Sequence, residues 1–199
     1  IDFRKNLGQK WGTSFQVKRE EFDNVLLQSA QKLGADVRHG YEVLDYDNEK
    51  NQITAKDKKG QIKEFEARFV LDASGYGRVL PKLLDLDIPS DLKLRNAIFT
   101  RVKGEFRREG DAEGFIDIVI HDDNQAWLWV IPFSDGTTSF GVVCEEEYFK
   151  KTGLSKEEFF DKVIGEHSYL KEKFKDAQKI APVGIINGYS AAIKKMTGK

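Results

Sequence analysis

The stretch QAWLWVIPFSDG, residues 125–136, decides how the second half of the chain folds. Side chains two positions apart on a strand point the same way, so Trp127, Trp129 and Ile131 form one apolar face. The aliphatic residues between them make the other face apolar as well. Pro132 then ends the strand, because proline cannot donate to a ladder. We expect this strand to lie between two layers, or between a sheet and a ligand.

The two neighbouring tryptophans leave two interpretations open. Burying one indole contributes on the order of 2 to 3 kcal/mol, and each buried indole N–H also needs an acceptor. An aromatic core of an antiparallel sheet satisfies these requirements, and so does a wall that faces a ligand. The local pattern alone does not separate them.

Alternating apolar residues continue on both sides of this stretch and predict a mostly antiparallel sheet. Four strands are expected, over residues 96–106, 114–121, 126–133 and 138–143. Helices are expected over Lys156–Val163 and Leu170–Phe174, and Ser155 with Glu158 has the spacing of a capping box at the start of the first. The tail, residues 179–195, predicts one or two further strands.

The first half of the chain mixes helical and strand patterns. In order, we expect a strand, a helix, a three-stranded meander, a strand buried on both faces and a short helix, over residues 14–17, 22–33, 37–47, 52–57, 61–65, 69–71 and 80–86. The prediction is an α/β (α+β) fold. Residues 1–92 form part of a doubly wound domain with a β-meander, and residues 93–199 form an antiparallel-sheet lobe with a helical excursion at about 155–175.

Composition excludes several classes of protein. The 199 residues carry a formal net charge of −1 and no basic run, so we expect no nucleic-acid partner. No apolar run is long enough to span a membrane, and the N-terminus has no signal-like segment, which favours a cytoplasmic protein. Cys144 is the only cysteine, and its apolar surroundings predict a buried, reduced thiol. The three histidines share no ligand spacing, so we predict no metal site.

Two polar features are candidates for binding an anionic ligand. The segment DASGYG, residues 72–77, follows an apolar strand and precedes a short helix, an arrangement that suits a nucleotide phosphate. A plain glycine-rich turn explains the same letters. Arg19 begins a helix, where a cation opposes the macrodipole and therefore calls for an anionic partner. Glu20 and Glu21 are alternative partners in an exposed ion pair.

Three motifs together resemble the flavin-dependent oxidoreductases of the p-hydroxybenzoate hydroxylase fold, and among them the flavin-dependent halogenases. The first is FQVKREEFDNVLLQSAQKLGADV, residues 15–37, and the second is VLDASGYGRVL, residues 70–80. The third and most specific is WLWVIP, residues 127–132, which matches the halogenase pattern Trp-x-Trp-x-Ile-Pro. The residues at the motif positions are Arg19, Phe22, Asp23, Leu26, Asp72, Ser74, Gly75, Trp127, Trp129, Ile131 and Pro132.

The resemblance implies an FAD enzyme in which reduced flavin and oxygen halogenate or oxygenate an aromatic or carrier-tethered substrate. Asp72, Ser74 and Gly75 are then expected to contact the cofactor, with Arg19 pairing its phosphates or bracing that region. The tryptophan motif is expected to wall a substrate or halide passage, and a flavin reductase is a possible partner. Residues 1–92 would be an incomplete FAD-binding portion.

The resemblance also implies that the chain is an internal fragment. The glycine-rich pyrophosphate fingerprint and the halogenase lysine are expected upstream, so no residue of this chain is assigned a catalytic role. We expect the chain by itself to be inactive and to bind FAD weakly or not at all. Two alternatives stay open: a geranylgeranyl-reductase-like enzyme that reduces isoprenoid double bonds, and an isolated substrate-binding module without flavin.

Overall fold

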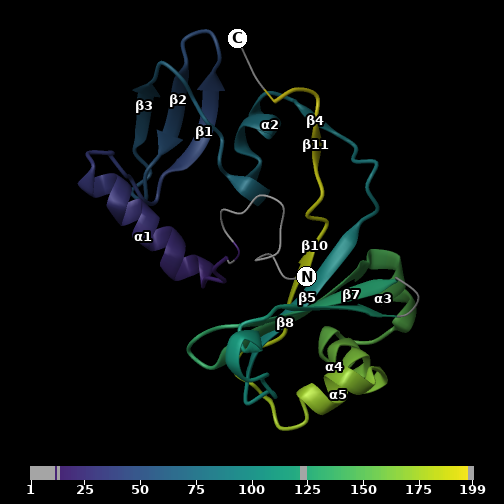
Figure 1. Cartoon of the computed structure of the whole chain (residues 1–199). Coiled ribbons are helices and arrows are strands. Elements are labelled where there is room, and N and C mark those ends of the chain that lie inside the picture. The colour runs from purple at the N-terminus through teal and green to yellow at the C-terminus, as the bar shows by residue number, and fades with distance from the viewer. Residues whose placement is uncertain (1–11, 13, 122–124, 197–199) are drawn as a thin grey trace. The chain divides into compact units, whose positions relative to one another are not determined.

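The computed structural model describes residues 12, 14–121 and 125–196. Contacts divide the chain into two compact units, one of residues 1–26 and 94–187 and one of residues 27–93 and 188–199. Each unit is described on its own (Figure 1). The predicted domains were residues 1–92 and 93–199, so the segments 1–26 and 188–199 are each grouped here with the other half of the chain. The domain boundaries stay a prediction. Among the described residues, no helix combines the length and apolar character that crossing a membrane requires.

The first unit is built on an antiparallel sheet in the order β10-β5-β8-β7-β6, with β9 paired to β5. The bounds are β5 (Arg95–Lys103), β6 (Asp117–His121), β7 (Ala126–Pro132), β8 (Thr137–Glu145), β9 (Gln178–Lys179) and β10 (Gly184–Asn187). The four strands expected from alternation correspond to β5, β6, β7 and β8 and are confirmed. The strand or two expected in the tail are also present.

Helices cover one face of this sheet and form the core with it (Figure 1). The short 3-10 helix η3 (Gly110–Ala112) follows β5, and the α-helices are α3 (Glu146–Thr152), α4 (Lys156–Glu166) and α5 (Ser168–Lys173). Phe140 of β8 is fully buried, with its ring 4.4 Å from that of Phe174 and 4.8 Å from that of Phe160. The predicted capping box is present: the Glu158 amide donates to Ser155 Oγ over 3.2 Å, and the Ser155 amide donates to Glu158 Oε2 over 2.9 Å.

The second unit contains the predicted meander and a two-stranded sheet. Its elements are β1 (Glu42–Asp47), β2 (Gln52–Lys56), β3 (Ile62–Glu66), the 3-10 helix η2 (Gly75–Gly77), α2 (Val79–Leu83), β4 (Asp87–Ile88) and β11 (Ala192–Ile193). The meander is antiparallel throughout, and β11 pairs with β4. The helix α1 (Arg19–Lys32) spans the boundary between the units. The mixed α/β fold class with mostly antiparallel sheets is therefore confirmed.

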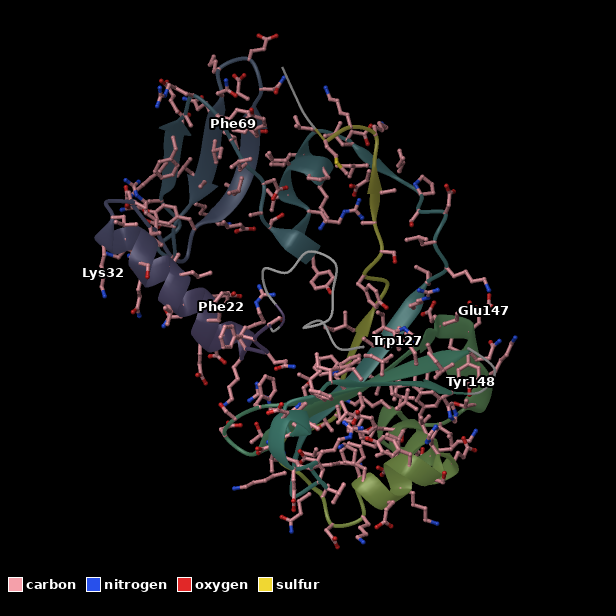
Figure 2. The ribbon with its side chains drawn as sticks, viewed as in Figure 1. Phe22, Lys32, Phe69, Trp127, Glu147 and Tyr148 are labelled. Atoms are coloured by element: carbon pink, nitrogen blue, oxygen red, sulfur yellow. The ribbon has the colours of Figure 1, made fainter. Side chains whose placement is uncertain are left out.

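Two predicted strands are corrected by the structure. Residues 14–17 and 69–71 are in no strand. Phe69, labelled in Figure 2, is 73% exposed and Leu71 is 82% exposed, although a strand buried on both faces was expected. A strand is held by its neighbours in a sheet, and the described part of the chain pairs no strand with either segment.

Candidate functional site

The two faces of β7 have different environments. Leu128 and Val130 lie in the core, with 0% and 1% of their surface exposed. Trp127 and Trp129 lie on the opposite face, away from α4 and α5, and Figure 2 shows Trp127 on that side. Trp127 is 36% exposed. Within its own unit, β7 therefore packs on one layer and presents its indoles on the other side.

The indole of Trp129 is held in a fixed orientation by the neighbouring strand β8. Its Nε1 donates to Ser139 Oγ over 3.1 Å, which meets the expected need for an acceptor. Gly141 lies directly beneath the ring, and a Cβ at that position would be 2.2 Å from Cζ2 of the indole. A glycine within a strand often marks such a close approach. The ring can lie against β8 only because residue 141 has no side chain.

Further apolar residues extend the indole face over β5 and β6. The rings of Trp127 and Trp129 are 6.0 Å apart, and the Phe99 ring is 6.3 Å from that of Trp129. Ile118 and Ile120, opposite the two tryptophans in register, are 59% and 55% exposed. We call these five residues the indole face. An exposed apolar area of this kind is a common feature of binding surfaces.

A pocket of about 530 Å³ opens where the indole strand ends. It is lined by Ser14, Phe15, Gln16, Gly110, Glu113, Gly114, Pro132, Phe133 and Ser134. Two of its walls are joined by the Gln16 side chain, which donates to the Gly114 carbonyl over 3.3 Å. Lys18 forms a hydrogen-bonded ion pair with Asp135 in the β7–β8 turn. The hydrogen bond from Lys18 is the main reason that the pKa of the Asp135 carboxyl lies far below its usual value. All the lining segments belong to the first unit.

The Asp72 turn in the second unit is closed by its own side chains. Asp72 Oδ1 accepts from the Ser74 amide over 2.8 Å, and Asp72 Oδ2 accepts from the Leu80 amide over 2.9 Å. Ser74 Oγ accepts from the Val79 amide over 3.0 Å. Burial acts to raise the pKa of Asp72, but the hydrogen bonds from Ser74 and Leu80 outweigh it and lower the pKa. Gly75 has a φ of 57°, which glycine adopts without strain.

The chemistry of this turn fits the hydroxyl groups of a flavin nucleotide better than its phosphates. The Asp72 carboxylate is ionised and accepts hydrogen bonds, so it suits a ribityl or ribose O–H and would repel an anion. The Val79 and Leu80 amides, which a phosphate would need, already bind Ser74 and Asp72. A Cβ on Gly75 would have no atom within 4 Å, so a ligand can approach the backbone there.

Arg19, at the start of α1, pairs with a residue of its own helix. Its Nε and Nη2 donate to the Asp23 carboxylate over 3.0 and 2.9 Å. This bidentate bond raises the pKa of the guanidinium, and 76% of the side chain remains exposed. The alternative partners expected from sequence, Glu20 and Glu21, are corrected to Asp23, because residues four apart face each other on a helix. Phosphate binding by Arg19 stays a prediction.

These features occur in a chain that matches a known family over most of its length. The model of the family described as "FAD binding domain" matches residues 2–181. The chain belongs to this family, and its cofactor is FAD.

Two curated relatives are halogenases. A 1H-pyrrole-2-carbonyl-[peptidyl-carrier protein] chlorinase of Pseudomonas fluorescens is 28% identical over 98% of this chain and 45% of its own length. Tryptophan 2-halogenase of Chondromyces crocatus is 31% identical over 71% of this chain and 28% of its own length. The chain thus spans less than half the length of either relative.

A solved structure shows the same fold. The flavoprotein/dehydrogenase from Cytophaga hutchinsonii has a TM-score of 0.83 and 36% sequence identity, over 94% of this chain and 46% of that one. The α/β fold with antiparallel sheets is therefore one that known flavoproteins share.

The predicted site residues fall into separate groups. Trp127, Trp129, Ile131 and Pro132 lie together on β7 in the first unit, and the pocket begins at Pro132. The Asp72 turn belongs to the second unit. Sequence reasoning missed several residues that shape the indole face and its turn, namely Phe99, Glu105, Arg107, Ser139 and Gly141. The only available signal was the glycine inside the strand SFGVV.

Cys144 lies in the core of the first unit, as predicted. It is free and only 2% exposed, and burial raises the pKa of its thiol to about 11. Such a thiol is protonated and unreactive near neutral pH.

Proposed function

We propose that the chain is part of a flavin-dependent, halogenase-like oxidoreductase that halogenates or oxygenates an aromatic or carrier-tethered substrate. The observation that carries this proposal is the paired-indole face of β7, which ends at the pocket beside Pro132. The FAD-binding family and the halogenase relatives support it. The chlorinase relative acts on a carrier-bound pyrrole, so a carrier-tethered acyl group is the first substrate to test.

In this proposal, the first unit selects and shields the substrate. FAD, once reduced, supplies the chemistry by reacting with oxygen. The indoles of Trp127 and Trp129 offer an aromatic wall that excludes water, and the fixed orientation of Trp129 keeps that wall in one place. The pocket beyond Pro132 would hold the substrate or lead the halide toward it.

The second unit would contribute to holding the cofactor. Asp72 would accept a hydrogen bond from a flavin hydroxyl, and Ser74 fixes the turn by bonding to Val79. Gly75 leaves the backbone open to close approach. We also propose that a partner flavin reductase supplies reduced flavin. A test compares turnover with reduced flavin from a reductase and from a chemical reductant. Equal rates would contradict a specific partnership.

The experiment that tests this function uses the complete protein loaded with FAD. The protein is given reduced flavin, oxygen and chloride or bromide, with pyrrole-2-carbonyl-loaded peptidyl carrier protein or free indole as the probe. Mass spectrometry that detects a halogenated product supports halogenation. An oxygenated product that forms without halide supports oxygenation. Turnover of neither probe, in a protein with stoichiometric FAD, contradicts the proposal.

The role of the indole face is tested by replacing both tryptophans. The Trp127→Ala/Trp129→Ala variant is expected to release more peroxide per reduced flavin consumed, because water reaches the site. Trp127→Phe/Trp129→Phe, which keeps an aromatic wall, is the matched control and should stay near the wild type. Unchanged peroxide release in the alanine variant would contradict the proposed role of the two indoles in excluding water.

A second candidate is a flavin-dependent reductase or dehydrogenase. It is favoured by one observation: the solved structure with 36% identity is a flavoprotein/dehydrogenase. Such an enzyme would reduce an unsaturated apolar substrate and would need no halide. Anaerobic oxidation of the reduced flavin by geranylgeranyl diphosphate, followed in the visible spectrum, would favour this candidate over the first.

A further inference from the structure

An ion pair between a buried glutamate and a partly buried arginine is bonded to the turn that follows the indole strand. The Glu105 side chain is only 1% exposed, and its Oε1 accepts from Arg107 Nε over 2.8 Å and from Thr138 Oγ1. Arg107 Nη1 donates to the Phe133 carbonyl over 2.8 Å, and Nη2 donates to the Thr137 carbonyl over 2.9 Å. One guanidinium thus joins a carboxylate to both ends of the β7–β8 turn.

The two carbonyls that Arg107 binds are the ones that close the turn. The Phe133 amide donates to the Thr137 carbonyl over 2.8 Å, and the Gly136 amide donates to the Phe133 carbonyl over 3.2 Å. The flat, forked guanidinium can bind two carbonyls at once, whereas a lysine ammonium is a single point on a flexible chain. The geometry of the turn therefore depends on the arginine fork as well as on its positive charge.

The turn forms one wall of the pocket. Phe133 lines the pocket together with its neighbours on either side, and its ring lies 5.3 Å from the Arg101 guanidinium. A buried ion pair is a weak source of stability, since apolar residues of the same volume often serve equally well. The ion pair has a more specific effect on the shape of the pocket, because it fixes the positions of Phe133 and Pro132.

We propose that Glu105 and Arg107 are positioning residues that fix the 133–137 turn and so set which substrates the pocket accepts. This role rests on the proposed flavin-dependent function. The two residues act through the pocket wall, and neither of them is proposed to contact the substrate. Arg107→Lys keeps the charge and removes the fork, so it isolates the effect of geometry.

The test compares Arg107→Lys with Arg108→Lys in the complete, FAD-loaded protein. Arg108 is a matched control, because its Nη2 bonds to Asp117 over 2.6 Å and to the Tyr169 hydroxyl over 3.0 Å, and neither of these bonds involves the turn. For each variant, kcat/KM is measured for a small probe, pyrrole-2-carboxamide, and a larger one, indole. The ratio of the two values does not depend on how much of the protein is folded.

Arg107→Lys is expected to change this ratio about tenfold, mainly through KM, because one charged hydrogen bond to the turn is lost. Arg108→Lys should leave the ratio within about twofold, as expected for substitutions away from a site. Equal ratios in wild type and Arg107→Lys overturn the proposal, even if both rates fall together. Such a parallel fall would indicate a purely structural role.

A second readout does not depend on activity. Hydrogen exchange at the Phe133 and Gly136 amides should quicken by about tenfold in Arg107→Lys, while the Phe140 amide in β8 keeps its protection. Unchanged exchange at both turn amides overturns the proposal. If wild-type protein turns over neither free probe, the selectivity role fails, whereas the proposed function is judged separately with the carrier-bound substrate. The exchange result alone then decides whether Arg107 holds the turn.

Discussion

Replacing Gly141 with alanine should disturb the indole face directly. The new Cβ would lie 2.2 Å from Cζ2, 2.4 Å from Cη2 and 2.7 Å from Cε2 of Trp129, all far inside contact distance. The indole ring is rigid and cannot bend away from the methyl group. It must rotate, and rotation breaks the hydrogen bond from its Nε1 to Ser139.

The expected cost follows from these two effects. Overpacking costs about 1 to 3 kcal/mol and a lost hydrogen bond costs about 1, so Gly141→Ala should lower the free energy of unfolding by about 2 to 4 kcal/mol. Urea unfolding followed by far-ultraviolet circular dichroism measures the change without using the indole signal. In parallel, the emission maximum of tryptophan should shift to longer wavelength as the ring moves into solvent.

Two controls make this experiment decisive. Gly165→Ala places a methyl group in α4 where no atom lies within 4 Å, and it should leave stability unchanged or slightly raised. The Gly141→Ala/Trp129→Leu double variant removes the clash and should lose less stability than the two single changes added together. A Gly141→Ala variant within about 0.5 kcal/mol of the wild type would refute the packing argument.

Two further predictions concern the first unit. Cys144 should not react with a thiol reagent at pH 8 in the folded protein, because burial raises the pKa of its thiol to about 11 from 9.0. The contribution of this thiol to stability is full below about pH 9 and is lost as the pH rises through about 11. Rapid labelling at pH 8 without urea would contradict this prediction. Ser155→Ala removes the N-cap of α4 and should lower the free energy of unfolding in urea by about 1 kcal/mol. Ser155→Asp is the control, because it keeps a hydrogen-bond acceptor at the cap. An alanine variant as stable as wild type would show that the cap contributes little.

Sequence patterns predicted those parts of the fold that depend on near neighbours. The strands β5 to β8 follow from alternation of apolar residues, and the start of α4 follows from Ser155 and Glu158. The failure at Phe69 and Leu71 has a different cause. An apolar run indicates a buried strand only if partner strands flank it, and no local pattern reports whether they do.

The candidate site was only partly visible in the sequence. The two tryptophans stand out as a pair, whereas the groups that orient them come from other strands. Arg107 reaches carbonyls 26 and 30 positions away, and no spacing rule links residues so far apart. Gly141 could have been noticed as a glycine inside a strand, but its partner Trp129 becomes evident only from the register of β7 and β8.

The proposed function requires the indole face to lie beside the flavin ring in the complete protein. Flavin fluorescence lifetimes test it directly, when the complete, FAD-loaded wild type is compared with the Trp127→Phe/Trp129→Phe variant. An indole quenches excited flavin by electron transfer only when the two rings nearly touch, and it accepts no energy from flavin at longer range. We expect the flavin lifetime in the wild type to be a small fraction of its lifetime in the variant. Equal lifetimes with stoichiometric FAD bound in both proteins would contradict this placement.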